Sequence, residues 1–119
     1  MKPTKYYSNT QEKYVAKKLG GRKQLNSGAT PFYKGDVILK DVLIECKTPT
    51  TEKKSFSIKK EWITKLNNER IGMRKKSCAI VFGFEPNGEQ FCVIPIDDYK
   101  QLLKDSEELF RVGEVLDEY

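Results

Sequence analysis

The stretch Gly35-Asp-Val-Ile-Leu-Lys-Asp-Val-Leu-Ile-Glu-Cys-Lys47 decides how the chain is expected to fold. Two runs of aliphatic, largely β-branched residues flank a central Lys-Asp pair, which predicts a hairpin of two buried strands. With the hairpin centred on that pair, partner residue numbers sum to 81, so Asp36 is expected to lie directly opposite Glu45. Lys47 follows Glu45 by two residues and shares its face of the strand.

The segments before the hairpin predict an arm, a helix and a long loop. Residues 1–9 look like a loose arm, in which Ser8 and Asn9 are candidate caps for a helix from about Thr10 to Leu19. Val15, Ala16 and Leu19 are spaced as one face of that helix, and Glu12 falls on the same inward face. Gly20-Gly21 ends the helix, and residues 20–35 form a loop rich in Gly, Ser, Asn and Lys.

The segments after the hairpin predict a second helix, two more strands and a last helix. Ser57 is a candidate cap for a helix that carries Ile58, Trp62 and Leu66 and ends at Gly72. Strands follow at about 77–84 and 90–96, joined by a turn at Asn87-Gly88. A helix then runs from 97 or 98 to 103 or beyond, and the acidic residues 105–119 continue it or pack irregularly. The order α-β-β-α-β-β-α describes an α/β or α+β fold with one mixed sheet flanked by helices.

The amino-acid composition excludes several classes of protein function. The 119 residues fit a single domain, and no stretch approaches the roughly 20 apolar residues that a membrane span needs. The chain has no histidine, which excludes Ser-His-Asp, Cys-His and His-based metal sites. Three cysteines without CxxC spacing favour a reducing compartment, so a cytoplasmic protein with no membrane partner and no secretory signal is expected.

Charge is distributed unevenly along the chain. Residues 1–104 carry 21 Lys and Arg against 11 Asp and Glu, whereas residues 105–119 carry Arg111 against six acids. A basic body of this kind favours a polyanionic partner, nucleic acid first, although a solvated lysine-rich surface would give the same count.

The opposed carboxylates carry the chemical argument. Like charges directly opposite in a sheet are destabilising, and aliphatic neighbours add a desolvation cost. A divalent cation resolves both problems, since Mg²⁺ takes one or two carboxylates together with waters and phosphate oxygens. Asp36 and Glu45 can share such an ion, and the backbone carbonyl of Cys46 can supply another ligand. Glu12 is a third carboxylate, which would bind the ion or support its ligands, or else is an ordinary helix acid. Lys47 would then stand beside the metal, where it can act on a water or a phosphate. The alternative is a hairpin whose acids simply pair with lysines.

The ordered set Glu12, Asp36, Glu45-x-Lys47 resembles the PD-(D/E)XK nuclease superfamily, and within it the small Holliday junction resolvases and resolvase-like phage endonucleases. The resemblance covers roughly residues 8–104 and implies a restriction-endonuclease-like core. It also implies Mg²⁺ or Mn²⁺ at Asp36 and Glu45, a helix carboxylate at Glu12, a catalytic Lys47 and phosphodiester hydrolysis by an activated water.

The family resemblance further implies a homodimer acting on four-way DNA junctions in recombination and repair. Gly35 stands where the motif has proline, and the glutamine often found on the following helix has no clear match, since Lys60 or Glu61 occupies that region. Another DNA endonuclease of the superfamily, of repair or restriction type, and a non-catalytic DNA-binding module of the same fold remain alternatives. Phosphate contacts are expected from Arg22, Lys23, Ser27, Lys34, Lys53, Lys54, Ser55, Ser57, Lys59 and Lys60.

Overall fold

The computed structural model describes residues 3–25 and 35–117. Within these ranges the elements are α1 (Thr4–Leu19), β1 (Arg22–Lys23), β2 (Val37–Ile38), β3 (Val42–Lys47), α2 (Lys60–Gly72), β4 (Ser77–Gly83), β5 (Gln90–Val93) and α3 (Ile96–Asp117). The strands form one sheet in the order β1-β2-β3-β4-β5. The predicted mixed fold with one mixed sheet is confirmed, with one strand more than the sequence predicts.

The predicted hairpin register is confirmed where the ladder forms. Val37 pairs with Ile44 and Ile38 pairs with Leu43, so the partner numbers sum to 81. At the turn, the Leu39 amide donates to the Val42 carbonyl at 2.9 Å, as the same register requires. Strand β2 is only two residues long, however, and the ladder stops before it reaches Asp36.

The rest of the sheet is built outward from β3. Strand β4 runs parallel to β3, with Glu45 beside Ile80, and α2 makes the crossover between them. Strand β5 returns antiparallel to β4 through the predicted turn, where Asn87 adopts a left-handed φ of 61°. Strand β1, which the sequence assigns to a loop, adds an edge to the hairpin by pairing with β2.

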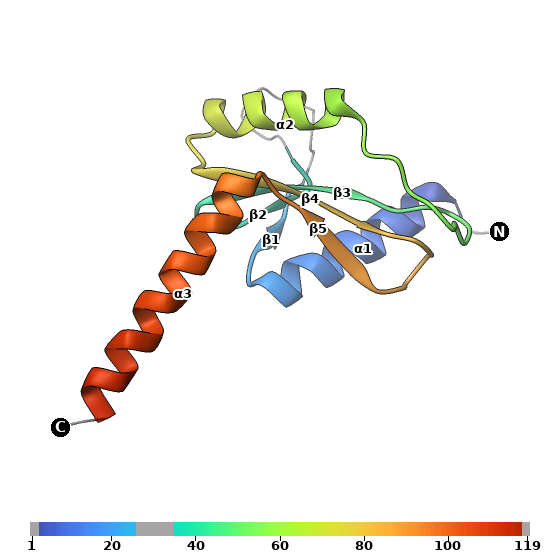
Figure 1. Ribbon diagram of the computed structural model, residues 1–119. Helices are drawn as coiled ribbons and strands as arrows, with labels where there is room; N and C mark the ends of the chain where they lie inside the picture. Colours follow the sequence, from blue (N-terminus) through green and yellow to red (C-terminus); the bar gives the residue numbers. More distant parts are fainter. Residues whose placement is uncertain (1–2, 26–34, 118–119) are drawn as a thin grey trace.

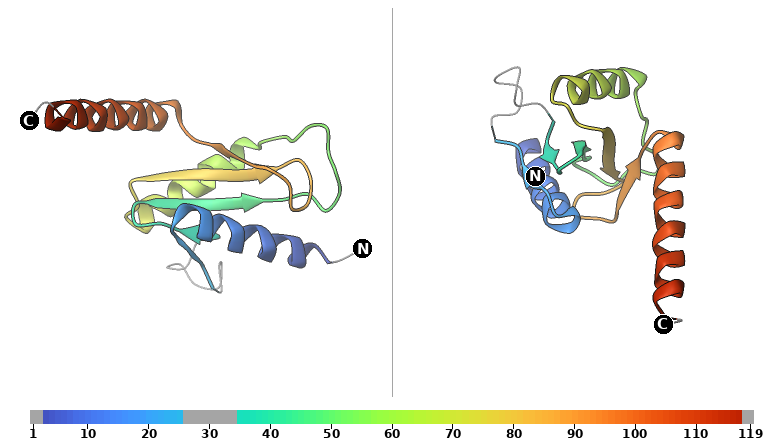
Figure 2. Two further views of the ribbon diagram at one scale, coloured as in Figure 1. Left: turned by 90° about the horizontal axis from the view of Figure 1, so that it is seen from below. Right: turned by 90° about the vertical axis from the view of Figure 1, so that its left-hand side faces the viewer.

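Helices α1 and α2 cover opposite faces of the sheet (Figure 1, Figure 2). Val15 and Ala16 of α1 pack on one face, against Val37, Ile44, Ala79 and Val81. Leu66 of α2 packs on the other, against Ile38, Leu43, Cys78 and Ile80. Each fully buried Leu, Ile or Val contributes roughly 1.5–3 kcal/mol through the area it removes from water. The two faces together hold β3 in the middle of the fold.

Helix α1 begins six residues earlier than the sequence predicts. It starts at Thr4 after Pro3, so the prediction of a loose arm over residues 1–9 is wrong for its described part, and Ser8 and Asn9 do not cap the helix. Proline at this place presets a φ of −59°, close to the helical value, which favours an early start. The prediction that Leu19 lies inward is also wrong, since its side chain is exposed.

Helix α2 begins later than the sequence predicts. It starts at Lys60 without a side-chain cap, so the prediction that Ser57 caps it is wrong. Tertiary contacts hold the preceding segment extended: the Lys53 amide donates to the Phe84 carbonyl at 2.7 Å, and Phe56 stacks on Phe82 with ring centroids 5.0 Å apart. These tertiary contacts outweigh the local tendency of Ser57 to cap a helix.

The acidic end of the chain continues α3 as one helix as far as Asp117. Figures 1 and 2 show that α3 leaves the sheet and projects away from it rather than covering a face. None of the helices in the described ranges is both long and apolar enough to cross a membrane.

Candidate functional site

Asp36 lies at the point where the β2–β3 ladder ends. Its amide donates to the carbonyl of Ile44, the cross-strand partner of Val37, at 2.8 Å, so the regular ladder is not continued to Glu45. Its carboxylate turns back to β3, and Oδ2 accepts a hydrogen bond of 2.8 Å from the Cys46 amide. Asp36 is thus held against the backbone of β3 by two bonds, next to Glu45 but not as its simple cross-strand partner.

Glu45 and Lys47 lie on the face of β3 that α2 covers, as the alternation predicts. Glu45 Oε1 is 3.6 Å from Lys47 Nζ, and about a quarter of each side chain remains exposed. Both residues line a small hollow of about 30 Å³ with Trp62, Lys65, Leu66 and Glu69 of α2. The acid and the lysine of the predicted motif are therefore adjacent and reachable from solvent.

Glu45 is a largely buried carboxylate with several charged groups nearby. Burial and then the negative charge of Asp36 raise the pKa of Glu45 to about 7, against the opposing effect of the Lys47 ammonium. Glu69 adds to the rise and Lys65 opposes it. The predicted conflict between Asp36 and Glu45 is therefore present, and near neutral pH Glu45 is poised between its charged and neutral forms.

Glu12 brings a third carboxylate to Asp36 from α1. Its side chain is 14% exposed, and Oε2 lies 3.5 Å from Lys23 Nζ. Burial and then the charge of Asp36 raise the pKa of Glu12, while Lys23 lowers it. Lys23 also donates to Asn9 Oδ1 at 2.7 Å, so its ammonium is engaged by α1. Lys23, expected from the sequence to contact phosphate, here balances the charge of Glu12.

The thiol of Cys46 takes no part in this chemistry as a charged group. It packs beside the apolar cluster under α1, on the side of β3 away from Glu45 and Lys47. Burial, followed by the charges of Asp36, Glu12 and Glu45, raises its pKa well above the usual range, which keeps the thiol protonated. Asp36, Glu12 and Glu45 therefore all act electrostatically on Cys46.

The donor set fits a cation held by few protein ligands. Over residues 3–25 and 35–117, no three Asp, Glu, Cys or His side chains form a group that could hold a metal ion. Asp36 and Glu45 are two carboxylates, and Mg²⁺ commonly uses one or two with water and substrate oxygens completing its shell. Burial and then the charge of Asp36 raise the pKa of Glu45, and a divalent ion bound between the two carboxylates would offset the part that is due to Asp36.

Sequence reasoning missed the contribution of α2. Lys65 Nζ is 3.7 Å from Glu69 Oε1, whose side chain is 13% exposed, and both act electrostatically on Glu45. Lys47 Nζ lies 4.3 Å from the centroid of the Trp62 ring, a cation–π contact. The spacing of Trp62, Lys65, Leu66 and Glu69 on one helix face was the available signal. Lys60 and Glu61, assigned to this region from the sequence, are exposed instead.

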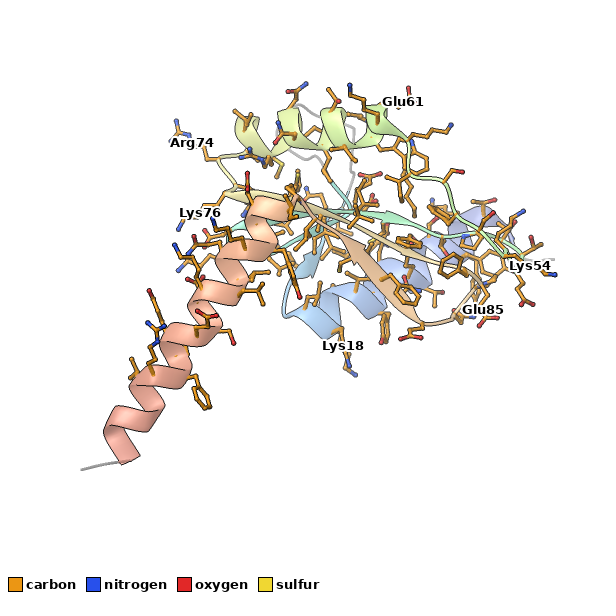
Figure 3. The ribbon with its side chains drawn as sticks, in the orientation of Figure 1. Lys18, Lys54, Glu61, Arg74, Lys76 and Glu85 are labelled. Carbon is orange, nitrogen blue, oxygen red and sulfur yellow. The ribbon has the colours of Figure 1, made fainter. Side chains whose placement is uncertain are left out.

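The candidate phosphate-binding residues that the structure describes come from two parts of the chain, β1 and the segment that leads into α2. Arg22 is exposed on β1. The other candidates are exposed in the segment that precedes α2 and at the first residue of α2, namely Lys53, Lys54, Ser55, Ser57, Lys59 and Lys60. Figure 3 shows Lys54 near Glu85 at one end of the molecule, far from Arg74 and Lys76. Lys59 Nζ is 5.6 Å from the Trp62 ring and so borders the site. Ser27 and Lys34 lie outside the described residues.

Comparison of the chain with family models, with curated proteins and with solved structures gives no match. Function is therefore inferred from the site residues themselves.

Proposed function

We propose that the protein is a metal-dependent endodeoxyribonuclease with a restriction-endonuclease-like core, selective for branched DNA of the four-way-junction type. The observation that carries the proposal is the placement of Asp36, Glu45 and Glu12 near one another and beside Lys47: Asp36 is fixed on the Cys46 amide, and Glu45 Oε1 lies 3.6 Å from Lys47 Nζ. Stability alone would disfavour such an arrangement. Strongly perturbed carboxylates beside a lysine at an accessible edge are typical of functional sites.

Each residue of the chain has a distinct proposed role. Asp36 and Glu45 would hold Mg²⁺ or Mn²⁺ with the Cys46 carbonyl, and the ion would supply Lewis-acid chemistry when bound. Asp36 is oriented for this by the bond from the Cys46 amide. Lys47 carries a positive charge toward the scissile phosphate and can move a proton to or from a water there. Glu12 keeps Lys23 in place and adds negative charge on the α1 side.

The distribution of charge supports a DNA substrate. Residues 1–104 have a formal charge of +10, from 21 Lys and Arg against 11 Asp and Glu. Phosphate contacts by lysine and arginine would give affinity without sequence preference, and that affinity should fall steeply with salt. The family resemblance alone supplies three parts of the proposal: selectivity for branched DNA, a symmetric dimer, and a role in recombination or repair.

Cleavage of labelled DNA tests the proposal. The wild-type protein should cut a four-way junction in the presence of Mg²⁺ or Mn²⁺ and not in EDTA, and should cut it faster than flap, linear duplex or single-stranded DNA. Asp36→Asn, Glu45→Gln and Lys47→Ala should each lower the rate at least 100-fold while junction binding persists. Glu61→Gln is the matched control, because Glu61 is an exposed acid on the outer side of α2 (Figure 3).

The outcomes separate the alternatives. Faster cutting of linear or flap DNA would replace junction selectivity by a repair or restriction-type activity at the same site. Binding without cleavage under any metal would indicate a non-catalytic module. Undiminished cutting by purified Glu45→Gln would reject the site itself.

A further inference from the structure

Helix α3 exposes an apolar stripe that its own fold does not cover. Ile96, Leu109 and Phe110 are 82, 74 and 68% exposed, and Tyr99, Leu102 and Leu103 are about half exposed. Among residues 96–113 of α3, whose side chains the structure describes, none belongs to the clusters that form the two apolar cores. Figures 1 and 2 show the helix extending away from the sheet. An apolar patch of this size on a protein surface marks an interaction site.

The stripe has the spacing of a helix that pairs with another helix. Ile96, Leu103 and Phe110 recur every seven residues, and Tyr99, Ser106 and Gly113 follow each of them by three. The first set gives the apolar seven-residue repeat of one core position of a coiled-coil seam, whereas at the other core position only Tyr99 is large and apolar, and Ser106 and Gly113 are small. Nothing lies within 4 Å of the place where a side chain on Gly113 would begin, so a partner helix can approach closely there.

We infer that α3 is a self-association element, which pairs along this stripe with α3 of a second copy of the chain. The extent of the stripe supports this occupant: six large apolar side chains, 49 to 82% exposed, lie along one helix, and a standard interface buries roughly 800 Å² per partner. The inference deepens the proposed function, since it names the surface through which the proposed dimer would form, and its test needs neither DNA nor metal.

The fold disfavours docking of α3 onto its own body. An apolar hollow of about 180 Å³, lined in part by Ile63, Val93 and Pro95, borders the root of the helix. The helix is continuous over 22 residues, roughly 33 Å, so its outer half cannot reach that hollow without a break. The outer half of the stripe therefore needs a second molecule.

Charge sets the direction of pairing. Residues 96–104 carry two Asp and two Lys, whereas residues 105–117 carry five acids and one Arg. Parallel pairing would bring the two acidic halves together, whereas antiparallel pairing sets each acidic half beside the neutral, lysine-bearing half of its partner. The two bodies then lie at opposite ends of the paired helices.

Sedimentation velocity of the full chain, without DNA or metal, tests the pairing. The wild type should sediment as a dimer of the 13.8-kDa chain at tens of micromolar and dissociate on dilution. Leu103→Glu with Phe110→Glu should shift the equilibrium at least 100-fold toward monomer. Arg111→Glu makes the same change of two charges on the outward, exposed side of α3 and should leave the dimer intact.

A wild-type protein that stays monomeric at 100 µM would overturn the inference, whatever the variants do. An unchanged dimer in the double variant would overturn it as well, provided that circular dichroism shows the helix retained. Direction is read from a spin label on Cys92, the exposed cysteine of β5 near the root of α3. Antiparallel pairing predicts a label separation above about 33 Å, and a clearly shorter separation would contradict it.

Discussion

Glu45→Gln should stabilise the metal-free protein while it abolishes cleavage. The pKa of Glu45 is raised from 4.5 to about 7, so the folded state holds this proton more tightly than the unfolded chain. The stabilisation by the bound proton is complete below about pH 4.5 and is lost as pH rises through about 7. Glutamine mimics the neutral acid at every pH and avoids this loss.

The magnitude follows from the pKa change. At about 1.4 kcal/mol for each tenfold change in proton affinity, a rise from 4.5 to about 7 corresponds to about 3 kcal/mol. The side chain is 26% exposed, so solvent screening reduces the expected gain to about 1 to 3 kcal/mol near pH 8. Near pH 4.5 the gain should fall below about 0.5 kcal/mol, because wild-type Glu45 then carries its proton.

Urea unfolding in EDTA at the two pH values measures this difference. Glu61→Gln, a change at an exposed acid of α2, should alter the free energy of unfolding by less than about 0.5 kcal/mol at either pH. A Glu45→Gln protein that is no more stable than wild type near pH 8, or equally stabilised at both pH values, would refute the repulsion between Glu45 and Asp36 on which the site depends.

Three further changes test other parts of the structure. Lys47→Met removes the charge that lowers the pKa of Glu45, so the pH midpoint of stability should move upward, and fluorescence of Trp62, the chain's single tryptophan, should change. Gln11→Leu loses the amide that donates to the Lys47 carbonyl at 2.7 Å and to Gln90, and should cost about 1 to 2 kcal/mol in urea unfolding. Gly35→Ala should cost at least about 2 kcal/mol in the same assay, because φ is +78° and the new methyl group would meet the Leu43 side chain. An unchanged pH midpoint for Lys47→Met, or an unchanged free energy of unfolding for Gln11→Leu or Gly35→Ala, would contradict the contact given for that residue.

The hairpin could be predicted because its register depends on residues that are close together in the sequence. Aliphatic runs on both sides of a short polar turn leave one register that buries Val37, Ile38, Leu43 and Ile44, and the structure has that register. The early end of the ladder was not predictable, since it depends on the bonds from Asp36 to the backbone of β3.

Residues that only tertiary packing brings to the site could not be predicted from the sequence. Glu69 and Lys65 reach Glu45 only because the crossover lays α2 along β3 and β4. The start of α2 was misplaced for a related reason, since contacts of Phe56 with Phe82 keep the segment before the helix extended. Glu12 was predicted correctly on the inner side of α1, since helical spacing is local information, although the helix itself begins earlier.

Binding of Mn²⁺ to the DNA-free protein, followed by the electron paramagnetic resonance of the free ion, tests whether Asp36 and Glu45 hold a cation. We expect uptake by wild type and by Glu61→Gln, and loss of at least tenfold in affinity for Asp36→Asn and for Glu45→Gln. Equal uptake by wild type and the Asp36→Asn, Glu45→Gln double variant, or no uptake by wild type at millimolar Mn²⁺, would contradict it.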